Sequence, residues 1–309
     1  MSFDVLQDKI RLMKNPTVAG LAARIEYVPE HIRKAAYEQY GVGLKGAAEA
    51  IWQFNVGLID ALCDIVPAVK PQAAYYENLG WQGMEMLERT IQYAKSKGMF
   101  VIADIKRGDI GSTAEAYAGH IDGCDIEGEH FDLWKEDYIT INPYLGVDGI
   151  EPFLKVLRKD EKGIFVLVRT SNPSSGELQD KMMEDTYMYN QVADLVSKWG
   201  EDTIGEYGYS KVGAVVGATH PAQGVELRKR MPHTFFLVPG YGAQGGKGAD
   251  LKGFFDENGV GCIVNSSRGI IAAYKKDALI ADVENVGPEF AEASRRAVIA
   301  MKEDLQNAF

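Results

Sequence analysis

The chain has 309 residues, of which 46% are hydrophobic and 25% are charged, and it carries a formal net charge of −11. This composition predicts a globular protein with a large core, and the acidic balance disfavours nucleic acid and anionic membranes as partners. No run of about 18 apolar residues could span a membrane, and the start of the chain lacks the apolar core of a signal peptide. We therefore expect a cytoplasmic protein in which an anionic substrate would need a local basic pocket.

Short apolar runs alternate with longer helical patterns from one end of the chain to the other. The runs are continuous rather than alternating in polarity, which is typical of strands buried on both faces. Eight such strands are predicted, at residues 17–21, 64–70, 99–105, 138–143, 163–170, 212–218, 234–239 and 261–267. The helical patterns between them include 31–41, 83–98, 149–163, 188–200 and 221–231.

Eight strand and helix units predict an α/β fold of the (β/α)₈ TIM-barrel type, which typically needs about 250 residues. The amino-terminal segment and insertions after strands three and five account for the surplus. Because no Pro/Ser-rich linker or change of composition divides the chain, we expect one domain over residues 1–309. A doubly wound open sheet is the alternative. In a barrel, the chemistry collects at the carboxyl ends of the strands.

The third predicted strand ends in a dense cluster of charges, ADIKRGDIGST at 103–113. Alternation along a strand places Asp104 and Lys106 together on the face opposite the apolar residues around them, so that both point into the barrel mouth. A lysine flanked by carboxylates is held protonated, and is therefore a proton donor rather than a Schiff-base nucleophile. Asp109 would repel a substrate carboxylate beside it. The alternative is a purely structural network of salt bridges.

The last two predicted strands are followed by features that suit a phosphate. The glycines of FFLVPGYGAQGGKGAD (235–250) allow backbone N–H groups to converge on an anion. Arg268, in NSSRGI after the eighth strand, can place a guanidinium on the same group. Lys70 and the Thr170–Asn172 segment also follow strands, but an exposed lysine and ordinary turn chemistry explain them equally well.

The cysteines and histidines show no spacing typical of a metal site. Cys63, Cys124 and Cys262 lie far apart and suit free thiols in a reducing compartment. The densest group of potential ligands lies in IDGCDIEGEHFDLWKED (121–137), which we interpret as a solvated surface insertion because no paired CxxC or HxxxH spacing accompanies it.

These motifs together resemble orotidine 5′-phosphate decarboxylase in its longer bacterial (type 2) form. The resemblance covers nearly the whole chain, and its most specific element is ADIKRGDIGSTAEAYA (103–118). Supporting motifs are VKPQAAYYENLG, RTSNPS, VVGAT, VPGYGAQGG and SSRGI. The resemblance implies a lyase of de novo pyrimidine biosynthesis that converts orotidine 5′-phosphate to uridine 5′-phosphate and CO₂. It implies no metal or organic cofactor, and a homodimer with shared active sites.

The resemblance also assigns roles to individual residues. The family's charged tetrad falls on Lys70, Asp104, Lys106 and Asp109. Lys106 would protonate C6 of the pyrimidine after CO₂ leaves, Asp104 and Lys70 would hold it and reach the ribose, and Asp109 would sit beside the leaving carboxylate. The implied substrate-binding residues are Ile110, Thr113, Ser171, Gly240, Gln244, Arg268 and Gly269.

The resemblance assigns the pyrimidine and the phosphate to different binding residues. Ser171 would read the pyrimidine edge, whereas Gln244 and Arg268 would close over the phosphate with backbone help around Gly240 and Gly269. Because the family's site is shared across its dimer, Asp109 and Thr113 would enter the partner's site.

One position departs from the family pattern. The family's first strand commonly ends in Gly-Leu/Ile-Asp-Pro, whose Asp binds a ribose hydroxyl, whereas this chain has Ala22 and Ala23 after Gly20 and Leu21. We predict a weakened enzyme, because remote binding energy supports the chemical step. The alternatives are a metal-dependent decarboxylase or aldolase of sugar phosphates from the same suprafamily, and a catalytically impaired uridylate-binding protein.

Overall fold

A computed structural model describes residues 2–242, 244–280 and 287–308. Within this part of the chain, eight parallel strands close into a barrel in the order β1-β12-β11-β10-β7-β6-β3-β2. The strands are β1 Thr17–Leu21, β2 Ala68–Pro71, β3 Phe100–Arg107, β6 Tyr138–Ile141, β7 Gly163–Arg169, β10 Ser210–Val216, β11 Thr234–Val238 and β12 Cys262–Ser266. All eight predicted strands and the predicted (β/α)₈ barrel are confirmed.

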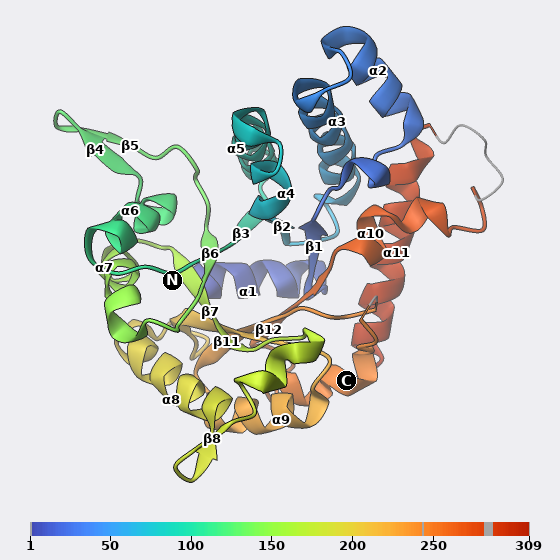
Figure 1. Cartoon of the computed structure of the whole chain (residues 1–309). Helices are drawn as coiled ribbons and strands as arrows, with labels where there is room; N and C mark the ends of the chain where they lie inside the picture. Colours follow the sequence, from blue (N-terminus) through green and yellow to red (C-terminus); the bar gives the residue numbers. More distant parts are fainter. Residues whose placement is uncertain (1, 243, 281–286, 309) are drawn as a thin grey trace.

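Helices surround the barrel (Figure 1). They are α1 Ser2–Met13, α2 Glu30–Tyr40, α3 Leu44–Leu62, α4 Ala73–Glu77, α5 Gly80–Ser96, α6 Gly111–Asp122, α7 Glu151–Lys159, α8 Met188–Gly200, α9 Pro221–Arg230, α10 Arg268–Ile271 and α11 Glu289–Gln306. The five helical patterns that the sequence predicted correspond to α2, α5, α7, α8 and α9. None of the described helices is long and apolar enough to cross a membrane.

The second strand begins four residues later than predicted, at Ala68 instead of residue 64. The N–H groups of Ile65 and Val66 both bond to the carbonyl of Leu62, the last residue of α3. These apolar residues therefore belong to the turn that follows the helix rather than to the strand, and their apolar character alone could not distinguish the two.

Two apolar layers hold the barrel together, one inside it and one between the strands and the helices. In β3, Val101, Ala103 and Ile105 pack in the outer layer, whereas Ile102 packs in the inner one. This confirms the alternation predicted for that strand. At the amino ends of the strands, Phe3 of α1 lies between aromatic rings, with its centroid 4.8 Å from that of Tyr138 and 4.7 Å from that of Phe235. Helix α1 therefore closes the barrel at this end.

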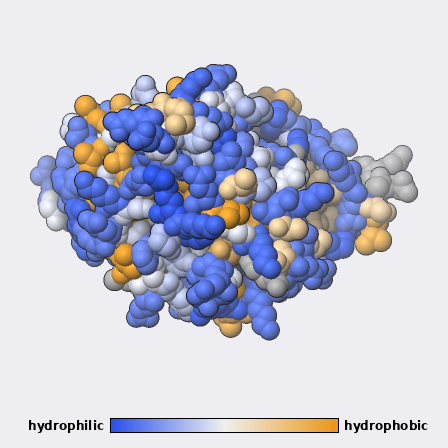
Figure 2. All heavy atoms as spheres, turned by 90° about the horizontal axis from the view of Figure 1, so that it is seen from below, coloured by the Kyte–Doolittle hydropathy of each residue, from blue (hydrophilic) through white to orange (hydrophobic). Residues whose placement is uncertain are grey.

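Two small hairpins project from the barrel (Figure 1). Strands β4 (Cys124–Ile126) and β5 (Glu129–Phe131) follow the third barrel strand, and β8 (Met182–Met183) and β9 (Thr186–Tyr187) follow the fifth. Both β4 and β5 are exposed, as expected for a solvated segment. Hydrophilic side chains also predominate on the face in Figure 2, where apolar residues form small separate groups.

The solvated interpretation of residues 121–137 is wrong for the end of this segment. Glu136 is fully buried and its carboxylate lies 3.1 Å from Nδ1 of His120, whose ring stacks on Trp134. Burial raises the pKa of the Glu136 carboxyl, and His120 opposes that shift. Asp137 accepts a hydrogen bond from the N–H of Val101. These contacts tie the base of the hairpin to the barrel. No group of three or more potential metal ligands converges anywhere in the described residues.

Candidate active site

A cavity of about 840 Å³ opens at the carboxyl ends of the barrel strands. Its apolar lining includes Leu167, Val215 and Leu237, which come from three neighbouring strands. The charged side chains that line it are Arg24, Lys70, Lys106, Arg268 and a single described carboxylate, Asp104. An acidic protein thus holds a basic pocket, which favours an anionic ligand.

Asp104 joins the two lysines of the cavity. Its Oδ2 lies 2.5 Å from Nζ of Lys70, and its Oδ1 pairs with Nζ of Lys106. The hydroxyl of Thr140 donates to the same Oδ1 at 2.9 Å. Three donors therefore fix this carboxylate at the barrel mouth.

The two lysines differ in their exposure to the cavity. The side chain of Lys70, on β2, is 5% exposed, whereas that of Lys106 is 46% exposed. Burial acts to raise the pKa of the Asp104 carboxyl, but Lys70 and then Lys106 hold it well below its usual range. Burial also lowers the pKa of the Lys70 ammonium, against the attraction of Asp104. The geometry therefore presents the Lys106 ammonium to a ligand and keeps an ionised carboxylate behind it.

The backbone at Lys106 adopts a conformation that the sequence did not predict. Its φ is +46°, and the pairing of β3 with β6 shifts register between Ala103 and Arg107. The N–H of Lys106 bonds to the Thr140 hydroxyl at 3.0 Å. Holding a residue other than glycine in this backbone conformation costs about 1–3 kcal/mol of folding free energy, and positions with such strain cluster at functional sites. Alternation along 138–143 could have identified Thr140, which shares the inward face of its strand with Tyr138.

Asp109, Ile110 and Thr113 do not line the cavity of their own chain. The Asp109 carboxylate accepts a hydrogen bond from the N–H of Ile110 at 2.8 Å, just before α6. Ile110 is 52% exposed, and Thr113 lies exposed in the first turn of that helix. The structure therefore separates the fourth charge of the predicted tetrad from the other three, and its entry into a partner's site stays a prediction.

The residues expected to hold a phosphate do meet at one side of the cavity. Gly240, Gln244 and Arg268 all line it, and Gly269 follows Arg268 in α10. Gly240 has φ +99°, a conformation that residues with a side chain rarely adopt, so this position favours glycine. Ala243 of the same loop lies outside the described residues.

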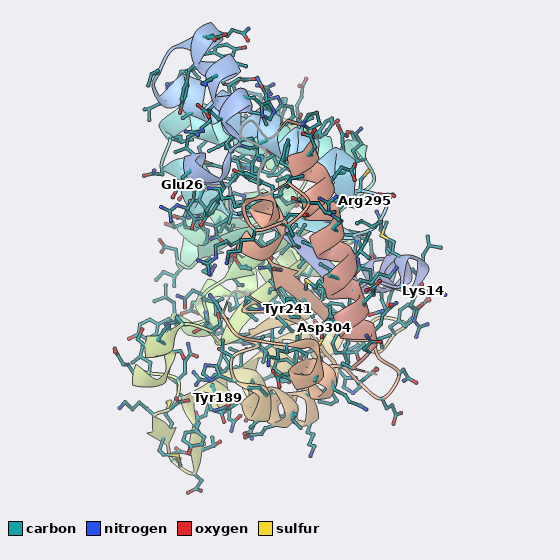
Figure 3. All side chains as sticks on the ribbon, turned by 90° about the vertical axis from the view of Figure 1, so that its right-hand side faces the viewer. Lys14, Glu26, Tyr189, Tyr241, Arg295 and Asp304 are labelled. Atoms are coloured by element: carbon teal, nitrogen blue, oxygen red, sulfur yellow. The ribbon has the colours of Figure 1, made fainter. Side chains whose placement is uncertain are left out.

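The Gly-rich loop is tied to the carboxyl-terminal helix. Asp304 of α11 accepts hydrogen bonds from the Tyr241 hydroxyl at 2.7 Å and from the N–H of Gly248 at 2.8 Å. Figure 3 shows Tyr241 and Asp304 beside each other at the end of this helix. One carboxylate therefore anchors both ends of the loop.

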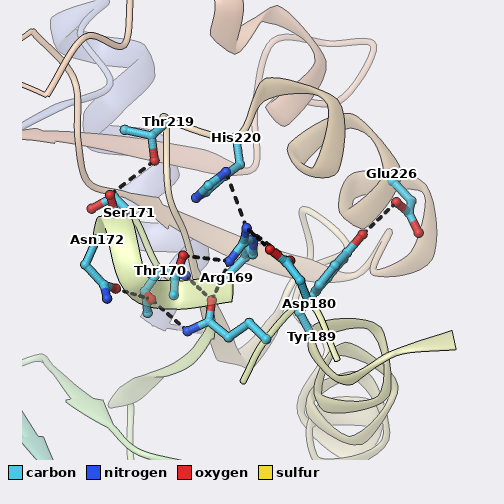
Figure 4. A network of polar contacts seen from close by, with 11 residues as sticks. Arg169, Thr170, Ser171, Asn172, Asp180, Tyr189, Thr219, His220 and Glu226 are labelled. Carbon is cyan, nitrogen blue, oxygen red and sulfur yellow. Dashed lines mark hydrogen bonds and ion pairs between the residues drawn. The ribbon is translucent and has the colours of Figure 1, made fainter. Parts of the chain in front are cut away.

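Ser171 also lines the cavity, next to Gly240, together with Thr170, Asn172 and Gln179. A polar network surrounds this segment (Figure 4), in which Thr219 bonds to the Ser171 carbonyl at 3.4 Å. The centre of the network is Arg169, which is 2% exposed. The motif RTSNPS includes Arg169, but nothing in the sequence pattern indicates that Arg169 or Gln179 belongs to a site.

Ala22 lines the cavity, whereas Ala23 is 1% exposed and packs in the outer apolar layer. The methyl group of Ala22 offers no acceptor to a ligand. The departure from the family pattern therefore lies at the cavity wall.

These features define a class of protein, a (β/α)₈ barrel with a basic cavity at the carboxyl ends of its strands and a partly exposed lysine at the end of the third barrel strand. The model of the orotidine 5′-phosphate decarboxylase / HUMPS family matches residues 53–282. A protein of Rhodopirellula baltica named orotidine 5′-phosphate decarboxylase is 45% identical over 293 residues, which are 94% of each chain. The chain belongs to this family.

Other relatives agree with this assignment. A protein of the same name from Caldicellulosiruptor bescii is 43% identical over 273 residues, covering 88% of this chain and 90% of that one. The solved structure of Leishmania donovani OMP decarboxylase is 28% identical, with a TM-score of 0.69 and coverage of 98% of this chain and all of that one. The Leishmania donovani UMP synthase structure is 29% identical, with a TM-score of 0.74 over 99% of this chain and 56% of that chain.

Proposed function

We propose that the protein decarboxylates orotidine 5′-phosphate to uridine 5′-phosphate and CO₂ in de novo pyrimidine biosynthesis. The observation that carries the proposal is the Lys106 ammonium, exposed in the cavity and paired with an ionised Asp104. Loss of CO₂ leaves an electron pair on C6 of the pyrimidine. Lys106 donates its proton to that carbon, the C6–H bond forms, and the neutral amine recovers a proton from water.

The other site residues have roles that fit this reaction. Lys70 and Asp104 hold the proton donor in place and face the ribose. Ser171 contacts the pyrimidine edge. Gln244 and Arg268 bind the phosphate, with the backbone at Gly240 and Gly269 beside them. Binding at the phosphate is remote from C6, and such energy supports the chemical step when it is used to orient the reacting part of the substrate.

We further propose a cytoplasmic homodimer of single-domain barrels in which Asp109, Ile110 and Thr113 complete the partner's site. Exposed apolar side chains on the segments after the second, third and fourth barrel strands support this proposal, because such residues are typical of an interface. They are Tyr75, Trp81, Ile110, Tyr144, Leu145 and Val147. These loops adjoin one another, since Arg107 pairs with Glu77 and Gly149 packs on the Asp109 carbonyl.

An ultraviolet assay of orotidine 5′-phosphate decarboxylation tests the reaction. Lys106→Ala should reduce kcat by at least about 10²–10⁴-fold, the usual contribution of a general acid, with the melting temperature retained. Lys34→Ala, which removes an exposed lysine paired with Glu30 on α2, is the matched control and should be fully active. Binding of uridine 5′-phosphate without turnover by the wild-type chain would instead favour an impaired binding protein.

Mixing two inactive variants tests the shared site. In a heterodimer of Lys106→Ala and Asp109→Ala chains, one of the two sites has both residues intact if Asp109 acts in the partner's site. Subunit exchange should therefore restore activity that neither variant has alone. If Asp109 acts within its own chain, both sites of the heterodimer are defective and the mixture stays inactive.

A further inference from the structure

Arg169, the last residue of β7, is almost completely buried, and its guanidinium bonds to polar side chains of the segment that follows this strand. Its Nη1 donates to the Ser175 hydroxyl at 2.8 Å and to Oε1 of Gln179 at 3.0 Å. Its Nη2 lies 3.1 Å from the carboxylate of Asp180. Figure 4 shows the guanidinium at the centre of these contacts. A single planar cation thus holds three positions of the segment that follows the fifth barrel strand.

Gln179 connects Arg169 to Thr170, which lines the cavity. Its Oε1, which accepts from Arg169, also accepts the N–H of Thr170 at 2.9 Å, and its Nε2 donates to the Thr170 hydroxyl at 2.7 Å. Thr170 in turn donates to Asn172 at 2.6 Å. Ser171 lies between these two residues, so the bonds hold the backbone before it and the side chains on both sides of it.

The other side of Ser171 has no room for movement. A Cβ on Gly217 would come within 2.9 Å of the Ser171 nitrogen, and one on Gly240 within 3.2 Å of its Cβ. The neighbouring loops therefore approach the Ser171 backbone as closely as glycine allows. Ser171 is therefore held between Gly217 and Gly240 on one side and the Arg169 network on the other.

We propose that Arg169 is a positioning residue that acts through Gln179 to hold Ser171 at the cavity wall, where Ser171 meets the pyrimidine edge. This inference rests on the proposed function and extends it to residues that do not touch the reacting atoms. The planar fork of arginine reaches Ser175, Gln179 and Asp180 at once, which the single ammonium of lysine does not. Displacing a binding group by about 1 Å can cost about 10²-fold in rate.

A double-mutant cycle between Gln179 and Ser171 is the central test. Gln179→Ala should lower kcat/KM for orotidine 5′-phosphate by about 10- to 100-fold in the wild-type background. This is the loss expected when Ser171 is displaced from its place at the cavity wall. In the Ser171→Ala background, the same change should cost less than about 3-fold, because the group that it positions is already gone. A merely structural role for Gln179 would lower activity equally in both backgrounds.

Arg228 provides a matched control for Arg169. It is also buried, and its guanidinium donates to the carbonyls of Phe254, Met231, Thr234 and Gly261, none of which lines the cavity. Arg169→Lys and Arg228→Lys should both lower the melting temperature. Only Arg169→Lys should lower kcat/KM of the folded protein, again by about 10-fold or more.

The possible outcomes separate the two proposals. A wild-type chain without decarboxylase activity would overturn the proposed function and this inference with it. An active wild type in which the Gln179→Ala loss is the same in both backgrounds would overturn the inference alone. If Arg169→Lys fails to fold, the cycle between Gln179 and Ser171 still decides the matter.

Discussion

Restoring a carboxylate at position 22 should make the enzyme faster. Ala22 lines the cavity and is partly exposed, so Ala22→Asp adds its side chain to open space rather than to the packed core. Four basic side chains and one described carboxylate line the same cavity, which makes it a favourable place for an added negative charge. The new carboxylate would accept a hydrogen bond from a ribose hydroxyl.

The size of the gain follows from the strength of that bond. A hydrogen bond to a charged group contributes about 1.5–3 kcal/mol, and about 1.4 kcal/mol corresponds to a factor of ten in rate. If the bond forms fully in the transition state, kcat/KM should therefore rise by about 10- to 100-fold. Because remote binding energy supports the chemical step, kcat itself should rise and not only the affinity.

The assay compares kcat/KM for orotidine 5′-phosphate among three variants. Ala22→Asp should show the full gain and Ala22→Asn a smaller one, since a neutral acceptor forms a weaker bond. Ala23→Asp is the control one position away. It buries a carboxylate in the outer apolar layer and should lower stability without raising activity. A folded Ala22→Asp variant with unchanged kcat/KM would refute the reasoning.

Three further predictions concern the barrel floor, the phosphate loop and pH. Phe3→Ala should lower the free energy of unfolding by about 3–5 kcal/mol in urea titrations, because the ring stacks on Tyr138 in a closed core; a loss below about 1 kcal/mol would contradict this role. Asp304→Ala should free the Tyr241 loop and raise KM for orotidine 5′-phosphate about tenfold, because both hydrogen bonds that anchor the loop are lost. Decarboxylation of orotidine, which lacks the phosphate, should not change. Burial and, to a lesser degree, a neighbouring guanidinium lower the pKa of His220 below 6.5. The unfolded chain therefore binds a proton at His220 more readily than the folded chain does. The free energy of unfolding should fall as the pH drops below 6.5. The melting temperature of His220→Gln should depend less on pH between 7.5 and 5.5, and an equal dependence would exclude His220 as a cause.

The strands and the charged cluster could be predicted because each leaves a local trace in the sequence. A strand buried on both faces is a continuous apolar run, and alternation alone brings Asp104 and Lys106 to one face. The left-handed backbone at Lys106 leaves no such trace, because it depends on a register shift against another strand. Arg169 was missed for a similar reason, since its partners Gln179 and Asp180 lie 10 and 11 residues further along the chain.

The segment 121–137 shows that a polar sequence does not always predict exposed side chains. Its acidic residues predict a solvated loop, and the hairpin strands are indeed exposed. Glu136 is nevertheless fully buried, because the neighbouring His120 supplies a partner from a different element. Pairing between elements decides the burial of a charge, and a single sequence does not reveal such pairs.

The aromatic stack at Phe3 makes the catalytic cavity a blind pocket. Phe3 and the rings beside it fill the barrel below the cavity floor. The nucleotide, the departing carbon dioxide and the water that replaces them therefore all pass through the open end of the cavity, at the carboxyl ends of the strands. The loop that carries Gln244 lines this open end, so the residues that we propose to bind the phosphate also lie on the path by which the products leave.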